Sequence, residues 1–469
     1  MSIETERAGD AGDWAPRAYK SYQLHNLEAI PEVAALGDQA IAEMKVVGSV
    51  LPFKANNYVI EELIDWGNIP DDPMFVLTFP QRGMLEPQHF EKVAALQAGG
   101  ADKKALDAAV HGVRLELNPH PAGQKEYNVP VLDGQRMEGM QHKYRETVLF
   151  FPSQGQTCHA YCAFCFRWPQ FVGMEGMKFA DREAEHLLAY LQAHPEVQDV
   201  LFTGGDPMIM KTQLLEAYIQ PLLEADLKSL HTIRIGTKAL SYWPYRFVTD
   251  PDADGLMDLF GSVHDAGKHA AIMAHFNHPR ELSTPILREA ARRLRAAHVQ
   301  IRTQSPVLGH INDSPQTWAA MWRQQVDLGM IPYYMFVVRD TGARHFFEMP
   351  LERAWQVFQG AYQRVSGVCR TVRGPSMSAT PGKVQVLGVA EAGGQKAFVL
   401  RFLQGRNPDW VARPFLARYD PAARWLDDLK PAFGGERFFF EEELASILSR
   451  ARAGEPAAPA DDPLEGGPP

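Results

Sequence analysis

Three of the four cysteines in this chain stand in the short stretch CHAYCAFC at residues 158–165. The fourth, Cys369, lies far along the chain, so the three have no even set of local disulfide partners. Thiolates are soft ligands, and clustered thiols in a reducing compartment are more often metal ligands than disulfide partners. We therefore predict that Cys158, Cys162 and Cys165 bind metal.

The spacing of these cysteines separates two kinds of metal site. A structural zinc site normally has four protein ligands, and the fourth would here be His159 or Cys369. Three cysteines in C-x3-C-x2-C spacing would instead leave one iron of a four-iron cluster open to another molecule. The cluster is favoured, because zinc sites usually show a second clustered pair of ligands.

A second segment that could bind a ligand is TGGDPM at residues 203–208. Two glycines followed by a carboxylate let the backbone approach a bound molecule closely, although the same residues also form common turns. We predict that Gly204, Gly205 and Asp206 bind a cofactor, because they follow the cysteines by one strand and one helix.

Short apolar runs recur after about residue 147 at the spacing of βα units. Helical patterns such as LREAARRLRAAH separate them, which predicts six parallel strands in either a barrel or an open doubly wound sheet. The predicted strands lie at TVLFF, DVLFTGG, TIRIGT, HAAIMAHF, VQIRTQS and IPYYMFVV. Their C-terminal ends, where ligands bind in both folds, carry polar residues.

The rest of the chain is assigned to extensions of this α/β core. Residues 1–146 are predicted as a mostly helical N-terminal extension, 147–385 as the core and 386–452 as a C-terminal extension with strands and a late helix. The Pro-, Gly- and Ala-rich residues 453–469 are predicted as a disordered tail.

Charge and hydropathy narrow the class of partner. A net charge of −10 with scattered basic residues argues against nucleic acid, and the chain has no apolar run long enough for a membrane span. The charged start MSIETERAGDAGDW does not resemble a signal peptide. We expect a cytoplasmic protein that acts on a small molecule.

The cysteine spacing and the GGD segment resemble the radical S-adenosylmethionine superfamily. This resemblance implies a (βα)6 partial barrel and a [4Fe-4S] cluster whose open iron is chelated by S-adenosylmethionine. It also implies a one-electron donor such as flavodoxin or ferredoxin, and a 5′-deoxyadenosyl radical that abstracts hydrogen. Gly204, Gly205 and Asp206 match the segment that receives the methionine amino group.

Longer segments resemble the lysine 2,3-aminomutase family over residues 50–385. They are LPFKANNYVIEELIDWGNIPDDPMF, CFR at 165–167, TGGDPM, RIGTK, HFNHP, TQSPVLGHIND and PYYMF. The family moves an amino group from C2 to C3 with the help of pyridoxal 5′-phosphate, which makes its members isomerases. By this resemblance Arg167 binds the substrate α-carboxylate, and the cofactor pocket includes Lys238, His275, Thr303 and Gln304.

The chain departs from the family at RGPSMSATPGK, residues 373–383. The family's cofactor lysine would align near Ala379, so Lys383 is the nearby amine that remains. Arg373 replaces an aspartate that the lysine enzymes use for the distal ammonium, and Arg339 precedes Asp340 near the second. Guanidinium groups repel an ammonium, so we expect Arg339, Asp340 and Arg373 to bind a substrate other than free lysine.

Three hypotheses follow for the function. The first is a radical 2,3-aminomutase that uses pyridoxal phosphate. The second is a radical enzyme on the same scaffold that works without pyridoxal phosphate, and the third is a non-catalytic metal-binding protein. C-terminal cysteines that bind zinc in some family members are missing, which leaves a homo-oligomer open.

Overall fold

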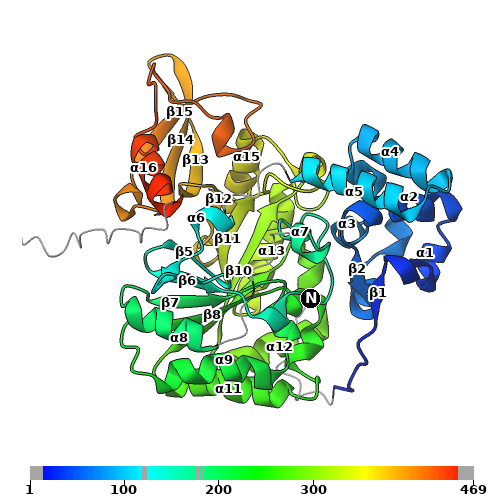
Figure 1. Ribbon diagram of the computed structural model, residues 1–469, viewed down its shortest axis with the longest axis horizontal. Helices are drawn as coiled ribbons and strands as arrows, with labels where there is room; N and C mark the ends of the chain where they lie inside the picture. The colour runs from blue at the N-terminus through cyan, green and yellow to red at the C-terminus, as the bar shows by residue number, and fades with distance from the viewer. Residues whose placement is uncertain (1–13, 119–123, 175–179, 181–183, 453–469) are drawn as a thin grey trace, which may run out of the picture.

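Seven parallel strands follow one another in chain order at the centre of the molecule (Figure 1). The computed structural model describes residues 14–118, 124–174, 180 and 184–452, so the predicted tail lies outside the described residues. The parallel strands are β6 (Thr147–Phe150), β7 (Asp199–Phe202), β8 (Thr232–Thr237), β9 (His269–His275), β10 (Gln300–Val307), β11 (Ile331–Val337) and β12 (Arg373–Ser378). All six predicted strands are confirmed. The seventh, β12, was not predicted, and it covers the first part of the segment in which the chain departs from the family.

A helix follows each of the first six parallel strands, and these helices pack on one face of the sheet. They are α8 (Ala184–Ala193), α9 (Thr212–Glu224), α11 (Ala253–Asp265), α12 (Pro285–Ala296), α13 (Pro315–Asp327) and α15 (Leu351–Tyr362). Alternate strand residues such as Val200 and Phe202 join the helices in one core. Strand order without reversal indicates a partial barrel, because a doubly wound sheet changes direction at a switch point.

Antiparallel strands continue the sheet beyond both of its parallel edges. β5 (Met140–Tyr144) pairs with β6, although its residues fall in the range predicted as the N-terminal extension. On the other side β12 pairs with β13 (Gly382–Ala392), followed by β14 (Gln395–Gly405) and β15 (Pro414–Arg418). β13 runs across residue 385, and the domain boundaries remain a prediction.

Side chains, rather than backbone pairs, join the two ends of the parallel sheet. Arg406 donates to the carbonyls of Thr380 and Tyr127 and to Asn128 Oδ1, at 2.9, 3.3 and 2.6 Å. Lys143 of β5 donates to the carbonyl of Ala379, just beyond β12. The sheet therefore encloses an interior without strand-to-strand closure.

The N-terminal residues form a helical layer over the C-terminal ends of the strands (Figure 1). Its main helices are α2 (Asp38–Val50), α3 (Pro73–Thr78), α4 (Pro87–Ala98) and α5 (Lys103–Leu117). They share a hydrophobic core with Trp243, Leu308 and Val338, which follow three of the strands. Asp72 caps α3 and binds Arg280 Nη1 at 2.6 Å, which ties this layer to the loop after β9.

The C-terminal strands pack with α16 (Glu441–Arg452), which confirms the late helix expected from FEEELASILSRAR. Within the described residues, no helix combines the length and the apolar character that a bilayer crossing requires.

Candidate active site

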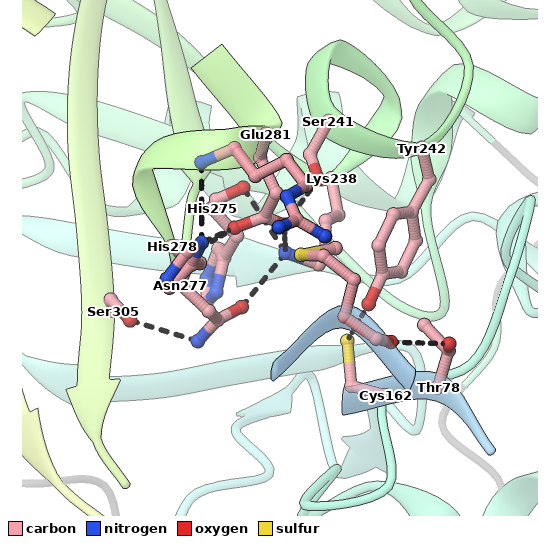
Figure 2. Close-up of polar contacts among 12 residues, drawn as sticks. Thr78, Cys162, Lys238, Ser241, Tyr242, His275, Asn277, His278, Glu281 and Ser305 are labelled. Atoms are coloured by element: carbon pink, nitrogen blue, oxygen red, sulfur yellow. Dashed lines mark hydrogen bonds and ion pairs between the residues drawn. The ribbon is translucent and has the colours of Figure 1, made fainter. Parts of the chain in front are cut away.

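The three clustered cysteines lie in the loop that follows β6, and all three are partly exposed and free of disulfides. Cys162 Sγ lies 3.3 Å from the hydroxyl of Tyr242, which belongs to α10 (Ala239–Tyr242) (Figure 2). Burial raises the pKa of each thiol above its ordinary value, and the neighbouring thiols raise the pKa of Cys158 and Cys165 further. The pKa of Cys165 rises to about 12. These thiols would need a bound cation to ionise, which fits metal ligands.

Residues of the N-terminal layer hold the backbone of this loop. Lys54 of β2 (Lys54–Asn56) donates its amine to the carbonyl of Cys158 at 2.7 Å. Asn56, fully buried, donates to the carbonyls of His159 and Tyr242 at 3.2 and 2.9 Å. Sequence reasoning did not single out these two residues, although both lie in the segment LPFKANNY that resembled the family.

The spacing of the thiols argues against a mononuclear zinc site. Among the described residues, one group of three or more potential ligands has all its ligand atoms within 4.8 Å of one another, and it contains no cysteine. Thiolates on one zinc ion lie roughly 3.8 Å apart, given Zn–S bonds of about 2.3 Å. Cys369, one of the two candidates for a fourth ligand, is buried in the helix-side core. The chemistry and the wider spacing fit a polynuclear cluster better.

Gly205 packs directly against the start of the cysteine loop. A Cβ atom at this position would lie 2.5 Å from the backbone nitrogen and oxygen of Thr157. The glycine therefore lets the end of β7 approach the loop that carries Cys158. Gly205 is therefore a support of the cysteine loop, in addition to its predicted role in cofactor binding.

Asp206 is buried, and its carboxylate accepts hydrogen bonds from inside the protein. The donors are Thr237 Oγ1 at 2.6 Å, the backbone nitrogen of Lys238 at 2.9 Å and that of Met208 at 3.0 Å. Burial raises the pKa of Asp206 to about 6. This carboxylate joins β7 to β8, so a cofactor contact from the GGD segment would come from the backbone of Gly204 and Gly205.

Lys238 also bonds within the protein. Its amine donates to Glu281 Oε1 at 2.5 Å and to Asn277 Oδ1 at 2.8 Å, as Figure 2 shows. Glu281 is fully buried and further accepts from Ser241. The predicted contact between Lys238 and a cofactor phosphate would have to compete with this neutralising ion pair.

The two predicted cofactor residues of β10, Thr303 and Gln304, face opposite sides of the sheet. Gln304 Nε2 lies 2.6 Å from His275 Nε2, and the two residues are direct neighbours on adjacent strands. Burial lowers the pKa of His275 to about 3, so the ring is neutral. Thr303 instead donates to Gln325 of α13 at 2.7 Å, on the helix side. The side chain of Thr303 therefore faces away from that of Gln304, because adjacent strand residues alternate in direction, and its contact with the cofactor stays a prediction.

Arg167 and Arg339 both lie close to the ring of Phe166, at the C-terminal edge of the sheet. Their guanidinium carbons lie 5.2 and 5.5 Å from the centre of the Phe166 ring. Arg167 Nη2 donates to Thr203 Oγ1 at 3.3 Å, while its Nη1 is buried without a hydrogen-bond partner. Arg339 Nε likewise has no hydrogen-bond partner, since Asp340 Oδ1 lies 3.6 Å away. These unsatisfied donors suit a planar anion.

Asp340 lines a pocket to which the other predicted site residues do not contribute. That pocket is lined by acidic residues such as Glu86, Glu116 and Asp428, and by none of the other predicted site residues. Asp340 therefore follows Arg339 in the chain, but it lines a cavity to which Arg339 does not contribute.

Lys383 and Arg373 lie toward the other end of the barrel interior. A cavity of about 480 Å³ is lined there by strand beginnings, including Asp199, Arg234, Arg302 and Arg373. Lys383 donates to Gln404 Oε1 at 3.0 Å and lies 4.2 Å from the centre of the Tyr334 ring. Burial, reinforced by Arg373 and Arg234, lowers the pKa of Lys383 to about 7. The predicted substrate residues therefore divide between two ends of the sheet.

Comparison with known proteins identifies relatives of this chain. No family model matches the chain. A protein of Aquifex aeolicus named "Putative L-lysine 2,3-aminomutase" is 29% identical over 405 residues, which are 86% of this chain and 93% of that protein. The chain is a relative of the lysine 2,3-aminomutases.

Two further aminomutases match a smaller part of the chain. The Escherichia coli L-lysine 2,3-aminomutase is 30% identical over 232 residues, 49% of this chain and 63% of that protein. The Bacillus subtilis L-lysine 2,3-aminomutase is 28% identical over 229 residues, 49% of this chain and 45% of that protein. A radical SAM methyltransferase structure from Sphaerobacter thermophilus aligns with a TM-score of 0.36 and 16% identity, over 61% of this chain and 93% of that one. That structural likeness is too distant to add to the relationship with the aminomutases.

Proposed function

We propose that this protein is a radical S-adenosylmethionine enzyme that moves an amino group from C2 to C3 of an amino acid other than free lysine. The relationship to the lysine 2,3-aminomutases supports the reaction class. The observation that carries the substrate proposal is the pair of buried guanidiniums, Arg167 and Arg339, whose unpartnered N–H groups lie beside the cysteine loop.

In this proposal, separate groups of residues would bind the cluster, S-adenosylmethionine and the substrate. Cys158, Cys162 and Cys165 would hold the cluster, and the backbone of Gly204 and Gly205 would receive S-adenosylmethionine. Together these groups supply a radical that abstracts hydrogen, and pyridoxal phosphate would hold the migrating amine. Arg167 would bind the α-carboxylate in a bidentate pair.

Positive charge at this edge disfavours a lysine side chain. Among the described residues, the acidic neighbour of this arginine pair is Asp340, which already lies 3.6 Å from Arg339. A distal ammonium would meet the charge of Arg339 without a free carboxylate to balance it. An amino acid with a neutral or acidic side chain fits these charges better.

The test uses the anaerobically reconstituted full chain, reduced and supplied with S-adenosylmethionine, pyridoxal phosphate and single amino acids. We expect 5′-deoxyadenosine and a β-amino acid with glutamate-like or neutral substrates, and at least tenfold less product with lysine. Arg339→Gln should narrow that difference. Equal or better turnover of lysine by the wild-type protein would contradict the substrate proposal.

One observation favours a reaction without pyridoxal phosphate as the second candidate. Lys383, the amine nearest in the sequence to the family's lysine position, reaches toward the strand beginnings and donates to Gln404. Product formation that is unchanged when pyridoxal phosphate is omitted from the purified and dialysed protein would support this second candidate.

A further inference from the structure

Lys143 is an interior amine that neither the sequence motifs nor the proposed function uses. It belongs to β5, at the point where the pairing of β5 with β6 shifts between His142 and Tyr144. Irregular pairing of this kind redirects a side chain relative to the regular alternation of a strand. The side chain of Lys143 crosses the open edge of the barrel and donates to the carbonyl of Ala379.

The backbone of Lys143 lies opposite the beginning of β6, between the pairs His142–Val148 and Tyr144–Thr147, and its amine reaches from there toward the edge that carries the candidate active site. Ala379 directly follows the C-terminal end of β12, and Arg339, whose charge acts on Lys143, follows the C-terminal end of β11. Arg339 shares the Phe166 ring with Arg167. Parallel barrels carry their chemistry at this edge, because the loops that follow the strands meet there.

Lys383 differs in the direction of its side chain. Its backbone pairs with Ser378 at the end of β12, but its amine reaches back to Tyr334, which pairs with Arg373 at the start of β12. The charges of Arg373, Arg234 and Asp199, all near strand beginnings, act on this amine. The amine of Lys383 therefore points toward the end of the interior that lies away from the cysteine loop.

The electrostatic setting of Lys143 favours a neutral amine. Burial lowers its pKa well below the ordinary value, and the positive charges of Arg406, Arg339 and Lys383 add to this effect. A neutral amine is a nucleophile toward an aldehyde, whereas an ammonium is not. The same cations would attract the phosphate of an anionic aldehyde cofactor.

We propose that Lys143, rather than Lys383, is the residue that binds pyridoxal phosphate covalently. This inference rests on the proposed use of that cofactor. The amine nitrogen forms a C=N double bond with the aldehyde carbon, and the aldehyde oxygen leaves as water with the two amine hydrogens. The step needs no oxidant or reductant. The carbonyl of Ala379, which lies near the position of the family's cofactor lysine, accepts a hydrogen bond from this amine.

The experiment traps the bond in the full-length protein without requiring turnover. The protein is incubated with an equimolar amount of pyridoxal phosphate, reduced with borohydride, digested and mapped by mass spectrometry. We expect the phosphopyridoxyl group on the peptide that contains Lys143. Lys143→Met should lower total labelling at least tenfold, while Lys383→Met and the exposed control Lys396→Met should keep it.

Labelling of Lys383, or labelling spread over exposed lysines without a preferred site, would overturn the proposal. The wild-type map alone decides this point even where a variant fails to fold. Formation of 5′-deoxyadenosine from S-adenosylmethionine is measured separately. Cleavage of S-adenosylmethionine without a Lys143 adduct overturns the assignment of Lys143 alone. An adduct without that cleavage leaves Lys143 assigned and overturns the proposed radical function.

Discussion

Each clustered thiol is half-buried, and burial raises its pKa, so that the loop holds neutral thiols until a cation arrives. We expect Cys158→Ala, Cys162→Ala and Cys165→Ala each to lose most of the iron bound after anaerobic reconstitution, because the cluster has no other thiolate nearby. Cys369→Ala should bind as much iron as the wild-type protein, since its thiol lies in the helix-side core. Iron and sulfide assays test this, and iron loss confined to the Cys369 variant would contradict it.

Lys383 should make the stability of the protein depend on pH. The folded state lowers its pKa from 10.5 to about 7, so below pH 7 the folded state carries the full cost of burying the charge. This cost falls as the pH rises from about 7 to 10.5 and vanishes above that value. Because the residue is half-buried, we expect Lys383→Met to stabilise the protein by on the order of 2 kcal/mol at pH 6.5.

Urea denaturation of both proteins at pH 6.5 and pH 10 measures this difference. The gain from Lys383→Met should shrink at the higher pH, and Lys396→Met should show no such trend because its side chain is exposed. A gain that grows with pH would show that the charged amine is stabilised in the folded state.

At the level of single residues, sequence reasoning identified where polar groups lie along the strands but not which partners they meet. Arg167 was placed from its resemblance to the family, and the structure gives it an unpartnered N–H group beside the cysteine loop. Asp206 and Lys238 were also placed at the correct strand ends, yet both bond within the protein. Thr303 faces the helix side of the sheet, whereas the next residue, Gln304, faces the side of His275. Lys143 carried no signal, because its direction depends on a local irregularity in strand pairing.

Among the elements, the end of β7 supports the cysteine loop through a contact that leaves no room for a side chain. We expect Gly205→Ala to lower iron content severalfold and to weaken S-adenosylmethionine binding, because its Cβ would lie 2.5 Å from the backbone of Thr157. Gly261→Ala in α11 is the matched control, since a Cβ there meets no atom within 4 Å. That control should stabilise the protein by about 0.5–1 kcal/mol, as alanine does inside helices.

Iron content and binding of S-adenosylmethionine are measured together on the two glycine variants. Loss of S-adenosylmethionine binding with full iron content in Gly205→Ala would show that this glycine serves the ligand alone.

The strands themselves were predictable because apolar runs of the right length alternate with amphipathic helical patterns. β12 escaped prediction because the run RGPSMS holds a proline and a glycine and few apolar residues. Strand order, which distinguishes a partial barrel from a doubly wound sheet, depends on long-range pairing that no local pattern encodes.

For the molecule as a whole, Arg406 is a main connection across the open edge of the barrel. Arg406→Met removes three hydrogen bonds to residues on both sides of that edge. We expect a loss of about 2 kcal/mol in the free energy of unfolding, since hydrogen bonds to charged groups are stronger than neutral ones. Amide exchange in residues 127–144 and 378–383 should accelerate at least tenfold.

Hydrogen exchange followed by mass spectrometry tests this, with Arg437→Met as the control because Arg437 is exposed. Unchanged exchange at both segments in Arg406→Met would show that other contacts hold the edge.

The contacts of Lys54 and Asn56 with the cysteine loop have a consequence for maturation of the protein. They reach backbone carbonyls rather than thiols, so they can form before any iron is present. In zinc fingers the metal drives folding of the peptide around it. Here the ribosome delivers the supporting segment before the loop that it will hold, and the apoprotein should already present its three thiols on an ordered backbone. Cluster delivery would therefore be a late, reversible loading of a folded acceptor, and chelation should empty the site without unfolding the chain.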